Sequence, residues 1–153
     1  MNNTDNILQH AERHCKAHGT RLTVKRKHVL AGLIQSGTAL SAYELIAEVK
    51  KKYNQDLAAM SVYRILAFLE SEKLVHKLKL ANKYVACEHI SCDHAHGIPQ
   101  FLICRECNKV KEISIKPATI AELETTIDEA GFKLISPQFE MDCICDDCLA
   151  HAA

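Results

Sequence analysis

The chain has 153 residues, of which 48% are apolar, 25% charged and 5% aromatic, a size that fits one or two domains and excludes a large multidomain enzyme. No run approaches the roughly 20 apolar residues of a membrane span, and the polar residues 1–5 lack the layout of a signal peptide. We therefore expect a cytoplasmic protein with no membrane partner. In that reducing compartment, the eight cysteines favour metal binding or thiol chemistry over disulfides.

The net charge of zero conceals two halves of opposite charge. Residues 1–83 hold 14 Lys and Arg against 7 Asp and Glu, whereas residues 84–153 hold 5 against 12. Cysteine divides at the same place, since Cys15 alone precedes residue 84. These divisions predict two domains, the first of which meets a polyanion.

Apolar residues at helical spacing predict four helices in the basic half, over about residues 4–18, 24–36, 42–53 and 60–72. Gly19 and Gly37 suit the positions just after the first and second helices. Thr23 can cap the second helix. The Ser41-Ala-Tyr-Glu44 capping box predicts the start of the third, because each of these two side chains satisfies a backbone N–H of the other residue.

Runs of strand formers at residues 74–78 and 83–87 predict a hairpin after these helices. Helices followed by a hairpin in a basic segment are typical of a winged helix-turn-helix, in which one helix enters the DNA major groove. A small helical bundle with an incidental hairpin is the alternative. Residues 88–99 show no periodicity and are rich in His and Cys, so we expect a loop between the domains.

The acidic half reads as a small α/β unit. Strands are predicted over residues 100–104, 109–115 and 132–141, and a helix with proline in its first turn over 117–130.

Two Cys-x-x-Cys pairs give the strongest chemical signal in the sequence. Cys104 and Cys107 lie at a turn between two predicted strands, and 37 residues separate this pair from Cys145 and Cys148. Four thiolates close a tetrahedral zinc site, which predicts a structural zinc ion. A reactive dithiol is the alternative. Cys143 is a further thiol that could be a ligand of the same metal.

A second set of potential ligands is spread over the hairpin, the loop and the acidic half. Its members are His76, Cys87, His89, Cys92, His94, His96 and Glu112. A mixed set of sulfur, nitrogen and oxygen donors suits zinc. A site with ligands from both domains would make the angle between the two domains depend on metal, as in a sensor.

Three further histidines, His10, His14 and His18, recur at positions i, i+4 and i+8 of the first predicted helix. We interpret them as a solvated helical face.

The chain resembles the ferric uptake regulator (Fur) superfamily in the order and spacing of its motifs over nearly its whole length. The motifs are Arg21-Leu-Thr-Val-Lys-Arg26, Ser41-Ala-Tyr-Glu-Leu45, Ser61-Val-Tyr-Arg64 with Leu66 and Leu69, Leu74-Val-His-Lys77, Tyr84-Val-Ala-Cys87 and Cys104-x-x-Cys107. Within the superfamily, the Val75-His76-Lys77 and Val85-Ala86-Cys87 segments are most similar to the zinc uptake regulators. The resemblance implies a dimeric, zinc-loaded repressor that binds AT-rich inverted repeats in double-stranded DNA upstream of zinc-uptake genes.

The resemblance also implies an α+β fold with three parts. These are a winged-helix DNA-binding domain over residues 1–84, a hinge loop with metal ligands over 85–99, and a small α/β dimerisation domain with a four-cysteine zinc site over 100–153.

Site residues carried over from the family give two zinc ions per monomer. The structural zinc is held by Cys104, Cys107, Cys145 and Cys148, and the regulatory zinc by His76, Cys87, His96 and Glu112. Tyr43 and Arg64 match positions that contact bases, and Arg suits a purine edge through paired hydrogen bonds. The matching candidates for phosphate contacts are Tyr63, Arg21, Lys25 and Arg26.

Several alternatives remain open at this point. His89 or His94 could replace His96, and Cys87 or Cys92 could serve redox chemistry in an iron- or peroxide-sensing regulator of the same superfamily. An enzyme is disfavoured, because the His-x-Glu and Pro-Cys-x-x-Cys signature of the zinc deaminases is missing. A zinc-ribbon module that does not bind DNA is disfavoured by the charge of the basic half.

Overall fold

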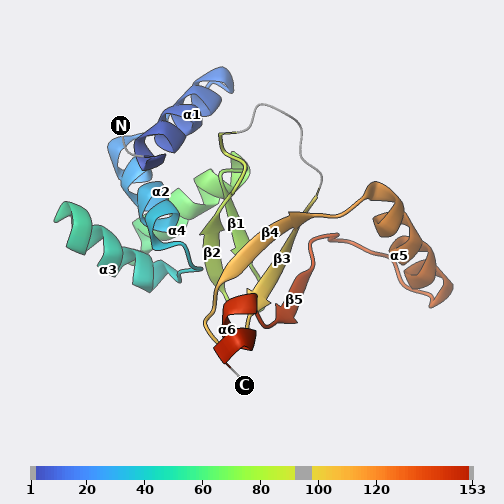
Figure 1. Cartoon of the computed structure of the whole chain (residues 1–153). Helices are drawn as coiled ribbons and strands as arrows, with labels where there is room; N and C mark the ends of the chain where they lie inside the picture. Colours follow the sequence, from blue (N-terminus) through green and yellow to red (C-terminus); the bar gives the residue numbers. More distant parts are fainter. Residues whose placement is uncertain (1–2, 92–97, 152–153) are drawn as a thin grey trace. The chain divides into compact units, whose positions relative to one another are not determined.

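A computed structural model describes residues 3–91 and 98–151 and divides the chain into two compact units, Met1–Cys92 and Asp93–Ala153. The N-terminal unit holds four helices and a hairpin (Figure 1). In chain order they are α1 (Asn3–Ala17), α2 (Val24–Ser36), α3 (Ala42–Tyr53), α4 (Ala59–Ser71), β1 (Val75–Leu78) and β2 (Lys83–Ala86). The four predicted helices and the predicted hairpin are therefore confirmed.

Short local signals set the helix ends. The Thr23 side chain caps α2 by accepting a hydrogen bond from the backbone N–H of Arg26 at 3.4 Å, and Gly37 ends this helix with φ +65°. Both hydrogen bonds of the Ser41–Glu44 capping box form at the start of α3: the Ser41 N–H donates to the Glu44 carboxylate, and the Glu44 N–H donates to the Ser41 hydroxyl. The backbone N–H of Ser41, with smaller contributions from the Ser41 hydroxyl and then the Lys83 ammonium, lowers the pKa of the Glu44 carboxyl.

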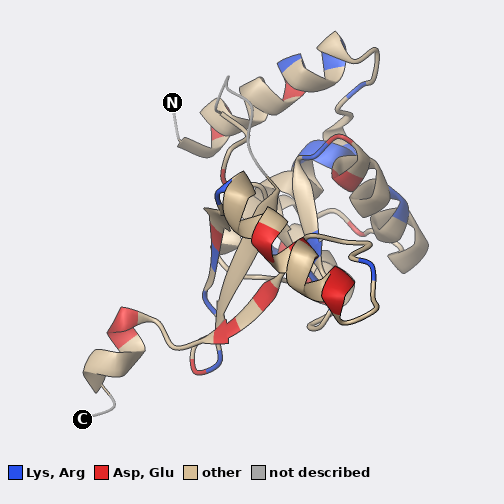
Figure 2. Cartoon of the chain, turned by 90° about the vertical axis from the view of Figure 1, so that its right-hand side faces the viewer, with Lys and Arg blue, Asp and Glu red and all other residues tan. Residues whose placement is uncertain are grey.

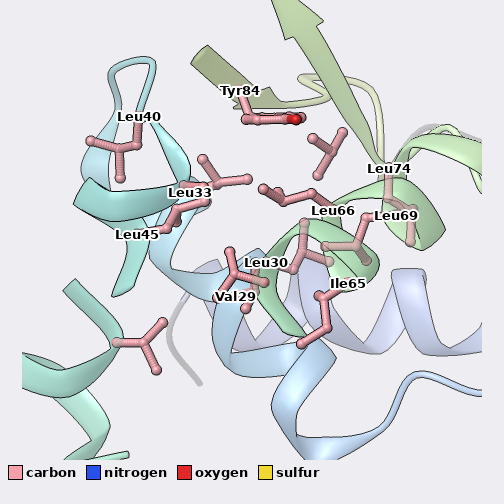
Figure 3. Packing of buried hydrophobic residues seen from close by; sticks show 14 of the residues in the cluster. Val29, Leu30, Leu33, Leu40, Leu45, Ile65, Leu66, Leu69, Leu74 and Tyr84 are labelled. Atoms are coloured by element: carbon pink, nitrogen blue, oxygen red, sulfur yellow. The ribbon is translucent and has the colours of Figure 1, made fainter. Parts of the chain in front are cut away.

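The core of the N-terminal unit lies between its four helices and the hairpin. Figure 3 shows Leu30, Leu45, Leu66 and Leu69 pointing toward one another, and all four are fully buried. Tyr84 covers one side of this cluster from β2. Burial of each large aliphatic side chain contributes roughly 1.5–3 kcal/mol relative to leaving that side chain exposed.

The hairpin gains a third, single-residue strand from the segment before α3. Leu40 exchanges two backbone hydrogen bonds with Tyr84, at 3.0 and 2.8 Å. His76 lies opposite Val85 in the antiparallel register of β1 and β2. The arrangement is that of a winged helix-turn-helix, with the hairpin as the wing.

The C-terminal unit contains a three-stranded sheet of order β4-β3-β5 and two helices. The elements are β3 (Pro99–Cys104), β4 (Val110–Ser114), α5 (Pro117–Glu129), β5 (Glu140–Cys143) and α6 (Asp146–His151). β3 pairs antiparallel with β4 and parallel with β5, and Cys104 is opposite Cys143. This parallel pairing brings the chain beyond β5 alongside the turn that follows β3. With both units described, the predicted α+β fold class is confirmed.

The strand predicted over residues 132–141 is wrong for most of its length, because β5 begins only at Glu140. Pro137 has no backbone N–H to donate to a strand. The fully buried side chain of Gln100 contacts this segment instead, donating to the Pro137 carbonyl and accepting from the Phe139 N–H. A glutamine side chain therefore supplies contacts that a strand would have made with backbone.

The charge difference between the halves is visible along the ribbon. In Figure 2 the helix facing the viewer, α5, carries acidic bands and no basic ones, in keeping with its sequence. In the N-terminal unit, basic residues occur on all four helices and on both strands of the hairpin. None of the helices in the described residues has the length and apolar character needed to cross a membrane.

Candidate metal sites and DNA-binding surface

Four thiols meet at the end of the C-terminal sheet. Cys104 is the last residue of β3 and Cys107 follows in the turn, while Cys145 and Cys148 lie after β5 and in α6. Their sulfur atoms all lie within 4.8 Å of one another. The sequence predicted this grouping from spacing alone, and the parallel pairing of β3 with β5 explains it.

The sulfur positions suit zinc. Cys104 Sγ and Cys148 Sγ are 3.8 Å apart, and Cys107 Sγ and Cys145 Sγ are 3.7 Å apart. In a tetrahedral site with Zn–S bonds of about 2.3 Å, neighbouring sulfurs are about 3.8 Å apart. The cysteines therefore fit a closed, four-coordinate zinc ion, and all four come from the same unit.

The environment of the sulfurs favours the thiolate form of Cys104. The backbone N–H groups of Cys145 and Cys107 point at Cys104 Sγ and lower the pKa of this thiol to about 6. A hydrogen bond with Cys145 Sγ, together with burial, raises the pKa of Cys148 to about 12. At Cys107 the N–H of Lys109 lowers the pKa, but the Cys104 sulfur and burial outweigh it, so the pKa is raised.

These shifts predict that zinc binding to the metal-free protein releases protons at neutral pH. The lowered pKa of Cys104 favours its thiolate there, whereas the raised pKa values of Cys107 and Cys148 mean that these thiols must lose protons to become ligands. Below a pH of about 6 Cys104 is protonated too, so zinc affinity falls further. Calorimetry in buffers of different ionisation enthalpy measures this release, and zinc uptake without proton release would contradict the prediction.

Cys143 lies outside the four-thiol group. It is half-buried at the end of β5, opposite Cys104 in the register. Among the described residues, the cysteines whose sulfurs converge are the four of the two Cys-x-x-Cys pairs. Cys143 therefore provides a matched control for substitutions in that group.

A second pair of potential ligands lies on the wing. Cys87 comes just after β2, two residues beyond Val85, which is opposite His76. Diagonal positions of this kind share one face of a hairpin, and the ligand atoms of His76 and Cys87 lie within 4.8 Å of each other. Cys87 Sγ also accepts a hydrogen bond from the backbone N–H of His89 at 3.4 Å. The wing therefore offers one nitrogen and one sulfur donor together.

The other predicted ligands belong to different parts of the chain. Glu112 lies in β4 of the C-terminal unit, opposite Phe101, and is buried with 7% of its surface exposed. His96 lies outside the described residues, as do the alternatives Cys92 and His94. The assignment of His76, Cys87, His96 and Glu112 to one site stays a prediction.

The predicted DNA-contacting residues lie mostly on exposed positions of the helices. Tyr43, near the start of α3, is 68% exposed, and Tyr63 and Arg64 are exposed on α4, the helix that a winged helix-turn-helix inserts into the major groove. Arg21 and Lys25 are exposed at the entry to α2. Each of these side chains is accessible to a partner.

Arg26 differs from the other predicted DNA contacts because it is engaged within the unit. Its guanidinium carbon lies 3.7 Å from the centre of the Phe68 ring, and its Nη1 donates to the Arg21 carbonyl at 2.6 Å. Arg26 therefore packs α2 against α4 and supports the backbone at Arg21. A contact between Arg26 and a phosphate stays a prediction.

Fold and site together define a class of protein: a winged-helix unit followed by an α/β unit with a four-thiol centre. The chain belongs to the ferric uptake regulator family, whose model matches residues 17–142. It is 31% identical over 146 residues to the zinc uptake regulation protein of Escherichia coli (strain K12), covering 95% of this chain and 83% of that protein.

Two further relatives agree with this membership. The ferric uptake regulation protein of Helicobacter pylori (strain ATCC 700392 / 26695) is 28% identical over 144 residues, covering 94% of this chain and 92% of that protein. A solved structure of a zinc uptake regulator complexed with zinc and DNA superposes with a TM-score of 0.84 at 29% identity, covering 100% of both chains. The predicted family is confirmed.

Proposed function

We propose that this protein is a zinc-responsive transcriptional repressor, which binds AT-rich inverted-repeat operators as a zinc-loaded homodimer in the cytoplasm and represses zinc-uptake genes. The observation that carries the proposal is the thiol of Cys87 beside His76 on the wing. Iron and manganese sensors favour nitrogen and oxygen donors, so a sulfur ligand selects for zinc. The similarity to a zinc uptake regulator solved with zinc and DNA supports the same conclusion.

We assign a different role to each of two zinc ions per monomer. Cys104, Cys107, Cys145 and Cys148 would hold a permanent ion, because a closed site of four thiolates exchanges slowly and stabilises the fold around it. His76, Cys87, His96 and Glu112 would hold the regulatory ion. The mixed donor set supplies fewer thiolates, which suits a site that follows the cellular zinc level.

The regulatory ligands belong to a wing, a loop and a second domain, and this distribution is the basis of the response. We propose that residues 1–84 form the DNA-binding domain, 85–99 the hinge and 100–153 the dimerisation domain. Zinc at the regulatory site would limit the arrangements that these domains adopt. Without it, DNA affinity falls in proportion to the fraction of molecules in the binding-competent arrangement.

Dimerisation is supported by apolar side chains that the C-terminal unit leaves exposed. Within the described residues of α5 only Ile120 is buried. Large exposed apolar side chains in this unit include Phe132 at 74% and Ile135 at 88%. Two copies would place their recognition helices on half-sites one helical turn apart, roughly 34 Å, as an inverted repeat requires.

DNA recognition is assigned to both base and phosphate contacts. Arg64 and Tyr43 would read base edges, while Tyr63, Arg21, Lys25 and Arg26 would hold the phosphates. The exposure of Arg64 and Tyr63 on the same helix supports this division.

The test is a mobility-shift titration of an AT-rich inverted repeat with the full chain, in zinc buffers and in separate samples with iron(II), manganese(II) or a chelator. We expect binding that tightens with zinc and weakens steeply as salt rises. Binding that responds to iron(II) and not to zinc would favour the iron-sensing alternative. Equal binding in every metal condition would refute the regulator described above.

A further inference from the structure

We propose an additional metal site within the N-terminal unit, formed by His14, His18 and Glu72, for a divalent transition ion of the zinc class. His14 lies in the last turn of α1 and His18 just beyond it, while Glu72 is the C-cap residue of α4. The three residues offer two imidazole nitrogens and a carboxylate oxygen that all lie within 4.8 Å of one another. This site is distinct from the four thiols and from the wing residues His76 and Cys87.

Helix endings bring the three side chains together. Residues four apart lie on one face of a helix, and the His14 and His18 rings have centroids 4.3 Å apart in a T-shaped arrangement. Gly19, with φ +74°, ends the helical turn and directs the chain back, so that the backbone N–H of Thr20 donates to the Cys15 carbonyl at 2.9 Å. The contacts of His14 with the Glu72 carbonyl at 2.8 Å and of His18 with the Glu72 carboxylate at 3.1 Å join the end of α1 to the end of α4.

One carboxylate oxygen faces both imidazoles. Glu72 Oε2 is 3.1 Å from His18 Nδ1 and 3.7 Å from His14 Nε2. Donor atoms bound to one zinc ion at about 2.0–2.1 Å are about 3.3 Å apart in a tetrahedral site, so these two separations lie on either side of the required value. The separation between His14 Nε2 and Glu72 Oε2 would shorten when both atoms bind the same ion.

The other carboxylate oxygen is held in place by a neighbouring hydroxyl. Thr20 Oγ1 donates to Glu72 Oε1 at 3.0 Å, which orients the carboxylate and leaves Oε2 directed at the histidines. Outer hydrogen bonds of this kind position the ligands of metal sites in proteins. The Glu72 side chain is only 10% exposed, whereas those of His14 and His18 are 38% and 56% exposed. The cluster is therefore anchored on the Glu72 side and open to solvent on the other.

The geometry also predicts a labile ion. His14 Nε2 lies 2.8 Å from the Glu72 backbone carbonyl, and a hydrogen bond there requires the proton to reside on Nε2. Metal binding has to displace this proton, so it competes with an existing hydrogen bond. With three protein ligands and a remaining position for water, the site is of the open type. We therefore expect it to fill at higher free zinc than the four-thiol site.

An ion at this position would fasten α1 to α4. The segment between His18 and α2 includes Arg21, which is exposed. Metal would thus reduce the freedom of the first helix and of the approach to α2, independently of the wing.

The test compares zinc bound per chain across a series of zinc buffers, for the wild-type full chain and for H18Q, E72Q and H10Q. The H10Q variant is the matched control, because His10 lies on the same helix but outside the cluster. We expect wild type and H10Q to reach one zinc more per chain than H18Q and E72Q. Hydrogen exchange over residues 3–17 provides a second measurement, and we expect zinc to slow it in wild type and H10Q only.

The comparison distinguishes a metal site from a set of hydrogen bonds. If H18Q and E72Q bind as much zinc as wild type at every free concentration, the cluster consists of ion pairs and hydrogen bonds alone and the proposal is wrong. The ligands of the other two proposed zinc ions are unchanged in all four proteins. Those two ions therefore contribute equally to every protein and do not affect the difference in zinc bound per chain.

Discussion

Replacing Cys148 by serine is expected to remove the structural zinc and unfold most of the C-terminal unit. Two pairs of the four sulfurs lie 3.8 and 3.7 Å apart, as in a tetrahedral zinc site, whereas few apolar side chains are buried in the described part of this unit, among them Phe101 and Ile120. A core of this size supplies little stability without a metal or another cross-link. In zinc-finger peptides such an ion contributes roughly 10–16 kcal/mol of folding free energy.

Zinc content and protease resistance of the region after residue 98 measure this effect. The matched control is Cys143→Ser, which removes a thiol from the same unit but from outside the group. We expect the control to keep its zinc and its resistance. A Cys148→Ser protein that retained both would show that the four cysteines do not form the structural centre.

Replacing Arg64 by alanine is expected to weaken operator binding by roughly 5- to 150-fold, the equivalent of 1–3 kcal/mol for one paired contact to a base. Arg64 is exposed on α4, next to the exposed Tyr63. The loss should be accompanied by relaxed specificity at one position of each half-site. Binding to operator variants, measured at one fixed salt concentration, tests both effects.

Two comparisons make the Arg64 prediction specific. Arg105→Ala removes the same charge from the acidic unit, where the side chain lies 3.8 Å from Asp142, and should leave DNA binding nearly unchanged. Lys25→Ala should weaken binding to all sequences alike and reduce the salt slope by about one. If Arg64→Ala behaved like Lys25→Ala, Arg64 would contact phosphate and not a base.

The elements that the sequence predicted best are those defined by local signals. Thr23, Ser41 and Gly37 mark helix ends through hydrogen bonds or backbone conformation within a few residues, and each acts as predicted. The Cys-x-x-Cys pairs likewise define their group by spacing. Each of these signals is contained in a few neighbouring residues, although the two Cys-x-x-Cys pairs meet only because β3 pairs with β5.

The features that the sequence analysis missed depend on contacts between distant residues. The segment before β5, where a strand was predicted, is contacted by the side chain of Gln100, which lies 37 residues before Pro137. The short helix α6 follows Cys145 and was not predicted, although Asp146 and Asp147 in its first turn are a recognisable signal.

The histidines of α1 show the same limit of local reasoning. Their spacing was interpreted as a solvated face, but Glu72, which is 54 residues from His18, changes that interpretation. Nothing in the local sequence around either histidine indicates this carboxylate. Only the packing of α1 against the end of α4 makes the cluster visible.

Control of DNA binding by zinc at Cys87 is tested most directly by measuring zinc per chain together with DNA affinity. The proteins compared are wild type, Cys87→Ala and the control Cys143→Ala. Both quantities are measured in zinc buffers and with a chelator too weak to remove the four-thiol zinc. We predict that Cys87→Ala stays folded, binds one zinc fewer than wild type and no longer binds DNA more tightly when zinc is added. If Cys87→Ala keeps the full zinc content and the full zinc response, the regulatory site proposed here is wrong, and Cys92 or a redox mechanism becomes the better account.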